Sequence, residues 1–205
     1  MSDDDGEGVD FGDMQGLLRF GYGHLPESCF LLLRVIDRDA ARRWLQQAPV
    51  NDARWLPKAP ERVLQLAFTH SGLVSLGVSD DALAGFSEPF ANGMTADGNR
   101  SRRLGDVGDN HPRHWCWGGR GSSTPDVLAL LYTRPGDLTG WRSQLENEDF
   151  ARGFELTLAL PGLASSSREP FGFVDGISQP EIDWWSQRSQ TPAAQASYRS
   201  IMAPG

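Results

Sequence analysis

A carboxylate between two glycines is the feature of this sequence with the clearest capacity for chemistry. Asp175 lies in the run GFVDG (172–176), close to the rings of Phe171 and Phe173. Glycines allow a backbone to approach a ligand closely, and aromatic rings exclude water and thereby raise the proton affinity of an acid. Asp175 is therefore a candidate proton carrier. An Asp-Gly pair also occurs in ordinary turns, so the residues alone leave both interpretations open.

Residues that could hold a metal or act as nucleophiles are few. The two cysteines, Cys29 in an apolar run and Cys116 in a tryptophan-rich loop, are too few for a disulfide framework or a thiolate metal cage. His111 and His114 could form a weak metal pair, but a metal site needs a rigid frame and further ligands. Structural roles are therefore favoured for these four residues.

The elements that must position Asp175 form a regular series. Four short apolar runs bounded by turn residues predict strands over 29–36, 62–69, 127–132 and 154–160. Two helices are predicted, with Asp37 and Asp137 as their N-caps, where apolar residues recur at helical spacing. These apolar residues are Ala41, Trp44, Leu45 and Ala48 in the first helix, and Leu138, Trp141 and Leu145 in the second.

The order of these elements predicts the fold. Strand, helix and strand are followed by an insertion, with helical pieces near 73–76 and 80–94, and then by strand, helix and strand again. This order is typical of an α+β, ferredoxin-like split βαβ fold with a four-stranded antiparallel sheet. Because two helices cover only one face of such a sheet, we expect a partner to cover the other face.

Composition divides the chain into three predicted parts. Residues 1–12 form an acidic tail, which we expect to be disordered. Residues 13–164 form the ferredoxin-like domain, with a helical and loop insertion at about 71–121. Residues 165–205 carry the glycine-flanked Asp175 and a C-terminal extension.

Charge and hydropathy exclude several kinds of partner. Five acids among the first ten residues supply −5 of the net charge of −8, which leaves −3 for the rest of the chain. The absence of a basic stripe argues against nucleic acid and anionic lipid as partners. No stretch approaches the roughly 18 to 20 apolar residues of a membrane span, and the N-terminus lacks the features of a secretory signal. We therefore expect a cytoplasmic protein.

The longer string around Asp175 resembles a family signature. EPFGFVDGISQP (169–180) is similar to the GxxDG motif region of dye-decolorizing (DyP-type) haem peroxidases. The run DMQGLLR (13–19) resembles the opening segment of that family, and LAFT (66–69) resembles its second-strand region. Further similar residues follow in family order: Gly72, Leu73, Leu76, Gly77, Gly93, Met94, Arg102, Leu104, Gly105 and Asp106. The resemblance thus covers roughly residues 13 to 205.

The resemblance implies a function for each residue of the motif. Asp175 would take a proton from bound hydrogen peroxide and return it to the leaving oxygen, and a neighbouring arginine would stabilise the developing charge. Phe173 would lie near the distal pocket of a haem b, and Gly176, Ile177 and Ser178 would line the haem edge. Organic dyes or phenols would then be oxidised one electron at a time. The chain would be half of a dimeric α+β barrel-like peroxidase.

One part of the family pattern is missing. In the family, a second, C-terminal ferredoxin-like domain supplies the axial histidine of the iron and the distal arginine. Nothing in this sequence matches that domain, and none of its histidines stands out as an axial ligand: His24, His70, His111 and His114. Arg168 could pair with Glu169 or a haem propionate, and Trp184 and Trp185 could relay an electron, but surface and packing roles are favoured for these residues.

Two hypotheses follow for the function. In the first, the chain is the N-terminal half of a haem peroxidase, inactive alone, and shares its haem with a second polypeptide that carries the C-terminal half. In the alternative, it is a haem-free ferredoxin-like interaction module derived from such a half. A truncated product of a longer peroxidase is a third possibility. A haem spectrum with a second chain favours the first hypothesis, and a colourless homodimer favours the alternative.

Overall fold

The computed structural model describes residues 9–95, 97–119, 124–162, 181–184 and 195–197 of the 205-residue chain. The chain divides into two compact units. We call Gly21–Asn51 with Leu56–Ala164 the sheet unit, and Met1–Phe20, Asp52–Trp55 and Ser165–Gly205 the small unit. The three-part division expected from composition stays a prediction.

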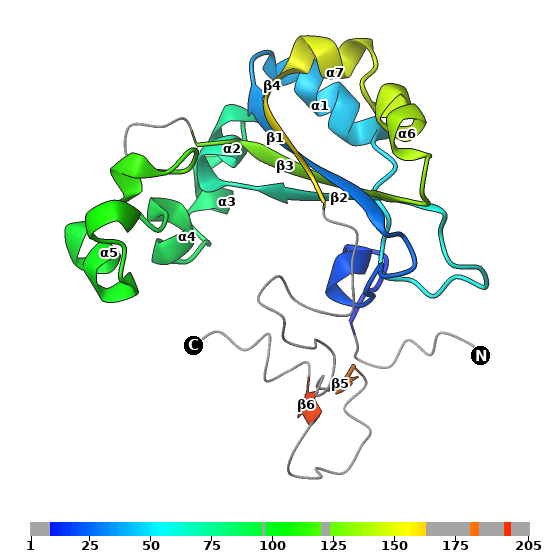
Figure 1. Ribbon diagram of the computed structural model, residues 1–205, viewed down its shortest axis with the longest axis horizontal. Helices are drawn as coiled ribbons and strands as arrows, with labels where there is room; N and C mark the ends of the chain where they lie inside the picture. The colour runs from blue at the N-terminus through cyan, green and yellow to red at the C-terminus, as the bar shows by residue number, and fades with distance from the viewer. Residues whose placement is uncertain (1–8, 96, 120–123, 163–180, 185–194, 198–205) are drawn as a thin grey trace. The chain divides into compact units, whose positions relative to one another are not determined.

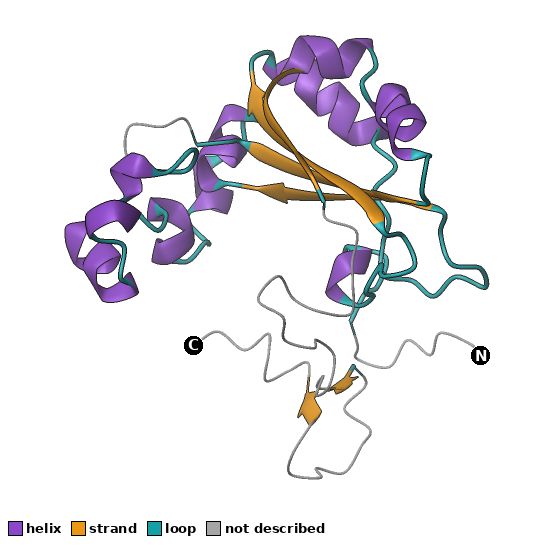
Figure 2. Cartoon of the chain, in the orientation of Figure 1, coloured by secondary structure: helices purple, strands orange, loops and turns teal. Residues whose placement is uncertain are grey.

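The sheet unit is built on a four-stranded antiparallel sheet, as the sequence predicted (Figures 1 and 2). The strand order is β2-β3-β1-β4, so β1 lies between two neighbours. The strands are β1 (Glu27–Val35), β2 (Arg62–Phe68), β3 (Val127–Thr133) and β4 (Phe154–Pro161). Their order along the chain and in the sheet is that of the ferredoxin-like split βαβ fold.

Three helices cover one face of this sheet (Figure 1). They are α1 (Arg38–Gln47), α6 (Leu138–Leu145) and α7 (Glu148–Gly153). Asp37 caps α1 as predicted, since its carboxylate accepts a hydrogen bond from the Ala40 N–H at 3.0 Å. This bond lowers the pKa of the Asp37 carboxyl. Helix α7, which is capped by Asn147, was not predicted.

The cap of α6 differs from the prediction. The Asp137 side chain makes no capping hydrogen bond. Instead the carboxylate of Glu27, at the start of β1, accepts from the Gly136 N–H at 2.7 Å and the Leu138 N–H at 3.4 Å. A remote carboxylate thus satisfies backbone donors at the start of the helix, where negative charge is also favourable.

The core lies between the helices and the sheet. Leu31 and Leu33 of β1 pack there with Trp44 of α1, which is 2% exposed. The Trp44 indole N–H donates to the Leu145 carbonyl at 2.8 Å, so the buried ring leaves no unpaired donor. The rings of Phe150 and Phe154 meet Trp44 edge-on, with centroids 5.4 and 5.5 Å away.

The opposite face of the sheet is also apolar. Phe30 pairs with Leu130 and Leu160 on its two neighbours, and paired residues of an antiparallel sheet lie on the same face. Phe30, Leu128, Leu130 and Leu160 are partly exposed and Leu158 is 36% exposed; we call this set the open face. At one end of it, the Tyr132 ring lies 5.6 Å from that of Tyr22, and burial raises the pKa of Tyr132.

An insertion of short helices separates β2 from β3 and lies beyond one end of the sheet (Figure 1). It contains α2 (His70–Ser75), α3 (Asp80–Leu83), α4 (Glu88–Asn92), α5 (Gly98–Leu104), η2 (Gly108–Asn110) and η3 (Pro112–His114). The sequence indicated helix at α2 to α4 and missed α5. Helix α5 is followed by its C-cap Gly105, whose φ of +82° is a left-handed conformation that favours glycine.

The small unit contains η1 (Gly16–Leu18), β5 (Glu181–Asp183) and β6 (Gln195–Ser197), and the last two pair in parallel. Within the described ranges of both units, no helix combines the length and the apolar character that crossing a membrane requires.

We predict that Gly153→Ala destabilises the chain, because a Cβ at Gly153 would lie 2.5 Å from the Ala41 nitrogen of α1. The backbones of α1 and α7 must separate to admit it, at a cost of about 1–3 kcal/mol. The matched control is Gly140→Ala in α6, where a Cβ meets nothing within 4 Å. That change should stabilise by about 0.5–1 kcal/mol. Urea unfolding measures both, and a Gly153→Ala chain as stable as the parent would refute the close contact.

Candidate functional site

The predicted catalytic and haem-contacting residues fall outside the described ranges. They are Phe173, Asp175, Gly176, Ile177 and Ser178, and all lie within 163–180. Their roles stay predictions. Arg168 and Trp185 also fall outside the described residues, whereas Trp184 is described.

The chain leaves the sheet unit for this segment at Gly162. The Gly162 N–H donates to the Ser28 carbonyl at 2.8 Å, and a Cβ on Gly162 would come within 1.8 Å of the Ser28 hydroxyl oxygen. Only glycine allows this close approach without a shift of its neighbour. The residue that precedes the acid-bearing segment is therefore fixed against the beginning of β1.

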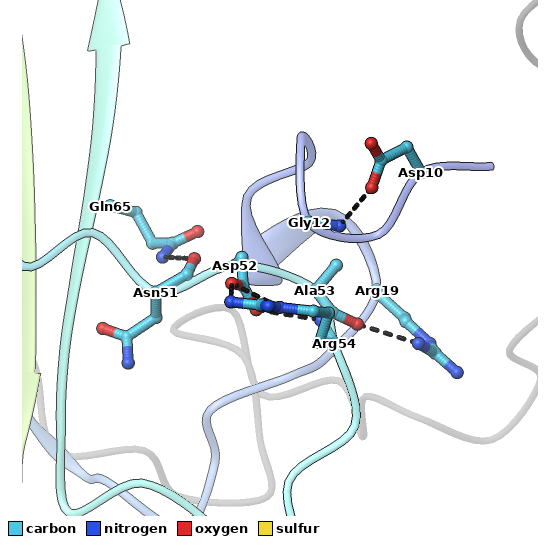
Figure 3. Close-up of polar contacts among 8 residues, drawn as sticks. All are labelled: Asp10, Gly12, Arg19, Asn51, Asp52, Ala53, Arg54 and Gln65. Atoms are coloured by element: carbon cyan, nitrogen blue, oxygen red, sulfur yellow. Dashed lines mark hydrogen bonds and ion pairs between the residues drawn. The ribbon is translucent and has the colours of Figure 1, made fainter. Parts of the chain in front are cut away.

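The described part of the small unit begins at Val9, ahead of the DMQG segment (13–16), and Figure 3 shows polar contacts in this region. The Asp10 carboxylate accepts from the Gly12 N–H at 2.8 Å, which closes the turn before this segment. The Ala53 N–H donates to the carbonyls of Phe11 and Met14, at 3.0 and 2.8 Å, and Ala53 is fully buried. The N-terminal segment and the loop Asp52–Trp55 are thus joined through their backbones.

Arg19 strengthens this junction through its side chain. Its guanidinium donates to the Ala53 carbonyl at 2.8 Å (Figure 3) and lies 3.9 Å from the centroid of the Phe11 ring. It also lies 5.1 Å from the Phe20 ring. A cation over an aromatic face contributes about 0.5–2 kcal/mol, more when water is excluded. We call Arg19, Phe11 and Trp184 the aromatic clamp, because the Phe11 ring meets Trp184 edge-on at 5.9 Å.

Arg19 lies in a segment that resembles the opening of the family, but the sequence predicts no role for Arg19 or Phe11. The sequence favours packing for Trp184, and the contact with Phe11 agrees with that interpretation. The pairing of Phe11 with Trp184 joins residues far apart in the chain. Neither residue type nor spacing carries a signal for such a contact.

An ion pair orders the loop beside Ala53. The guanidinium of Arg54 donates to Asp52 from Nε at 2.8 Å and from Nη2 at 2.5 Å, and the Arg54 backbone N–H donates to the same carboxylate at 3.0 Å. The pKa of the Asp52 carboxyl is lowered, mainly by the side-chain hydrogen bond from Arg54.

The four histidines are placed in three regions of the sheet unit. His24 Nε2 lies 3.0 Å from the Pro60 carbonyl, and His114 Nδ1 lies 3.2 Å from the Asp109 carbonyl. His111 Nδ1 accepts from the Arg113 backbone N–H at 3.2 Å, and the His70 ring meets that of Phe90 edge-on. Within the described ranges, no group of three or more His, Cys, Asp or Glu residues could hold a metal ion.

The two cysteines differ in their surroundings. Cys29 is buried in the core and Cys116 is exposed. Burial raises the pKa of the Cys29 thiol, which keeps it protonated and unreactive at neutral pH.

Comparison with known proteins finds relatives of one kind. A dye-decolorizing peroxidase from Mycena epipterygia is 32% identical over 143 residues, which cover 65% of this chain and 24% of the relative. Peroxidase 2 of Mycetinis scorodonius is 27% identical over 191 residues, which cover 87% of this chain and 35% of the relative. The chain is similar in sequence to dye-decolorizing peroxidases. It matches an N-terminal part of such enzymes and spans about a quarter to a third of these relatives.

Solved structures show that the fold is that of dye-decolorizing peroxidases. One such enzyme, in complex with 2,6-dimethoxyphenol, matches 92% of this chain with a TM-score of 0.71 and 23% identity, over 43% of its own length. The enzyme from Auricularia auricula-judae matches with a TM-score of 0.69 and 22% identity, over 42% of its length. No protein-family model matches the chain.

We predict that Asp52→Asn lowers the free energy of unfolding at pH 7 and has little effect on it at acid pH. The pKa of Asp52 is lower in the folded chain than in the unfolded chain. The ion pair therefore stabilises the fold at any pH above the unfolded-state pKa of Asp52. This stabilisation is lost as the pH falls through the folded-state pKa of Asp52. Because the pair is exposed, we expect a loss of about 0.2–1 kcal/mol at pH 7. Urea unfolding at pH 7 and at acid pH measures it, and an equal loss at both would contradict the ion pair.

Proposed function

We propose that this chain is the acid-bearing part of a haem peroxidase of the dye-decolorizing type. The observation that carries the proposal is the similarity of the chain to dye-decolorizing peroxidases, combined with a GFVDG motif in the position that the resemblance leads us to expect. The whole enzyme's activity extends beyond what these 205 residues match, so the function is proposed for the assembled protein.

Within the described ranges, none of the four histidines belongs to a group of residues that could hold a metal ion. The rings of His24, His111 and His114 are engaged by nearby backbone groups. The open face supplies apolar side chains and no ligand for iron. We therefore propose that the axial histidine comes from the C-terminal half of the enzyme, carried by a second polypeptide, while Phe173, Gly176, Ile177 and Ser178 line the haem from this chain.

The open face supports the proposed assembly. An apolar sheet face with partly exposed Phe30, Leu130 and Leu158 is the kind of surface that obligate interfaces bury, because they resemble a domain core cut in two. Burial of such a surface stabilises by roughly 25 cal/mol per Å² of apolar area. We propose that the C-terminal half covers it, which would complete a dimeric α+β barrel and leave this chain inactive alone.

The proposed mechanism rests on one proton carried by Asp175. The haem, when bound, supplies the iron that binds hydrogen peroxide and exchanges electrons with it. Asp175 would take a proton from hydrogen peroxide and return it to the leaving oxygen, so that the O–O bond breaks heterolytically and water leaves. An arginine from the other half would stabilise the charge that develops as the bond breaks.

Substrates of the proposed enzyme are small organic reductants. A solved relative is described in complex with 2,6-dimethoxyphenol, and another is described with an engineered haem pocket. We propose that the assembled enzyme likewise oxidises phenols or organic dyes one electron at a time.

We predict that Asp175→Asn in the assembled haem protein slows its reaction with peroxide by roughly two to four orders of magnitude, because the amide cannot carry the proton. Haem content and fold should not change, since the two side chains have the same shape. Stopped-flow absorption of the haem bands measures the rate.

The matched control is Glu155→Gln, which neutralises an exposed acid paired with Arg34 at the edge of the sheet. It should react at the parent rate. A parent-like rate in Asp175→Asn would remove this acid from the mechanism and, with it, the proposed function of the chain.

A further inference from the structure

Two of the three tyrosines of the chain pack against each other at one end of the open face. The ring centroids of Tyr22 and Tyr132 are 5.6 Å apart, and the ring planes are tilted by 39°. Aromatic rings in contact have centroids about 4.5–7 Å apart, so these two rings touch. Both residues belong to the sheet unit, whereas Tyr198 falls outside the described ranges. The fold thus places two phenols, which lose single electrons readily, side by side.

The two rings are carried by different kinds of backbone. Tyr132 belongs to β3, and the Phe30 ring of β1 meets it edge-on at 6.1 Å. Tyr22 begins a turn ahead of β1, which the Leu25 N–H closes by donating to the Tyr22 carbonyl at 2.8 Å. Tyr132 is therefore fixed by its strand, while Tyr22 lies in a loop, which can shift more readily than a strand.

The pair is largely shielded from water. Tyr22 is 7% exposed and Tyr132 is half-buried. Burial raises the pKa of Tyr132, so this ring stays a neutral phenol at neutral pH. Exclusion of water also protects reactive intermediates from side reactions. A radical formed on either ring therefore meets the other phenol before it meets solvent.

A base lies beside the pair. The ring of the exposed His24 is 6.3 Å from that of Tyr22. His24 Nε2 lies 3.0 Å from the Pro60 carbonyl, and a carbonyl oxygen only accepts hydrogen bonds. In the neutral imidazole, Nε2 therefore carries the proton and Nδ1 is the proton-accepting nitrogen. His24 thus offers a route to water for a proton that leaves Tyr22.

We propose that Tyr22 and Tyr132 form a site of oxidative modification, at which a one-electron oxidant joins the two rings by a carbon–carbon bond. Each phenol loses one electron and its hydroxyl proton, and the two radicals combine at carbons next to their oxygens. The hydrogens on those carbons then move to the oxygens, which restores both phenols. The chain has lost two hydrogen atoms. With hydrogen peroxide as the final oxidant, the two electrons and two protons reduce it to two molecules of water.

Contact between the rings favours a bond within one chain over a bond between chains. Groups held together react as though each were present at very high concentration. The bond would tie the turn ahead of β1 to β3. This inference goes beyond the proposed function, because any one-electron oxidant serves and a peroxidase reaction is only one source of such oxidants.

The test uses the full chain with an added oxidant, ruthenium(III) generated by light, at low protein concentration. Mass spectrometry of the digested chain should find the peptides of Tyr22 and Tyr132 linked and lighter by two hydrogen atoms than their sum. Dityrosine fluorescence should appear with a yield that does not depend on protein concentration. Tyr22→Phe and Tyr132→Phe, which keep both rings in place, should each abolish the signal. The matched control, Tyr198→Phe, should leave it unchanged.

Two results would overturn the proposal. One is dityrosine fluorescence that survives Tyr22→Phe or disappears in Tyr198→Phe. The other is a linked product whose yield rises with protein concentration, which would show a bond between chains. Because the test supplies its own oxidant, neither result depends on whether the chain belongs to a working peroxidase, and the reaction of Asp175→Asn with peroxide tests that function separately.

Discussion

The sheet unit depends on the pairing of β1 with a neighbour on each side. Because β1 is central, residues along it contact several other parts of the sheet unit. Leu31 and Leu33 face the helices and form the core, while Phe30 faces the opposite way and contributes to the open face. Glu27 caps α6, and the Ser28 carbonyl holds Gly162. A shift of β1 by one residue would exchange its two faces and undo all of these contacts, so its register is strongly specified.

The same strand links architecture to the proposed chemistry. Apolar residues on both faces would be expected of a strand buried between two layers, and here the helices supply only one layer. The open face is consistent with a chain that completes itself against another half. Gly162, fixed on Ser28, and Trp184, packed on Phe11, bound the segment that carries Asp175.

Local patterns predicted the elements whose signals are local. The apolar run of β1, the Asp37 cap and the spacing of Trp44 and its neighbours each need only a few adjacent residues, and each is confirmed. Helix α7 was not predicted, because six residues are too few to show a helical period of apolar residues. The capping of α6 by Glu27 and the contact of Phe11 with Trp184 could not be predicted, because each joins residues far apart in the sequence. The candidate acid came from a family resemblance, since an Asp-Gly pair alone does not distinguish a turn from a catalytic group.

The central proposal is that the haem iron served by Asp175 would be held by a histidine from outside this chain. The most direct measurement is purification of the native protein that contains this sequence, with its mass and absorption spectrum recorded together. The account predicts a haem Soret band and a mass that includes a C-terminal peroxidase half. A colourless chain that is folded and stable alone, or paired only with itself, would contradict it.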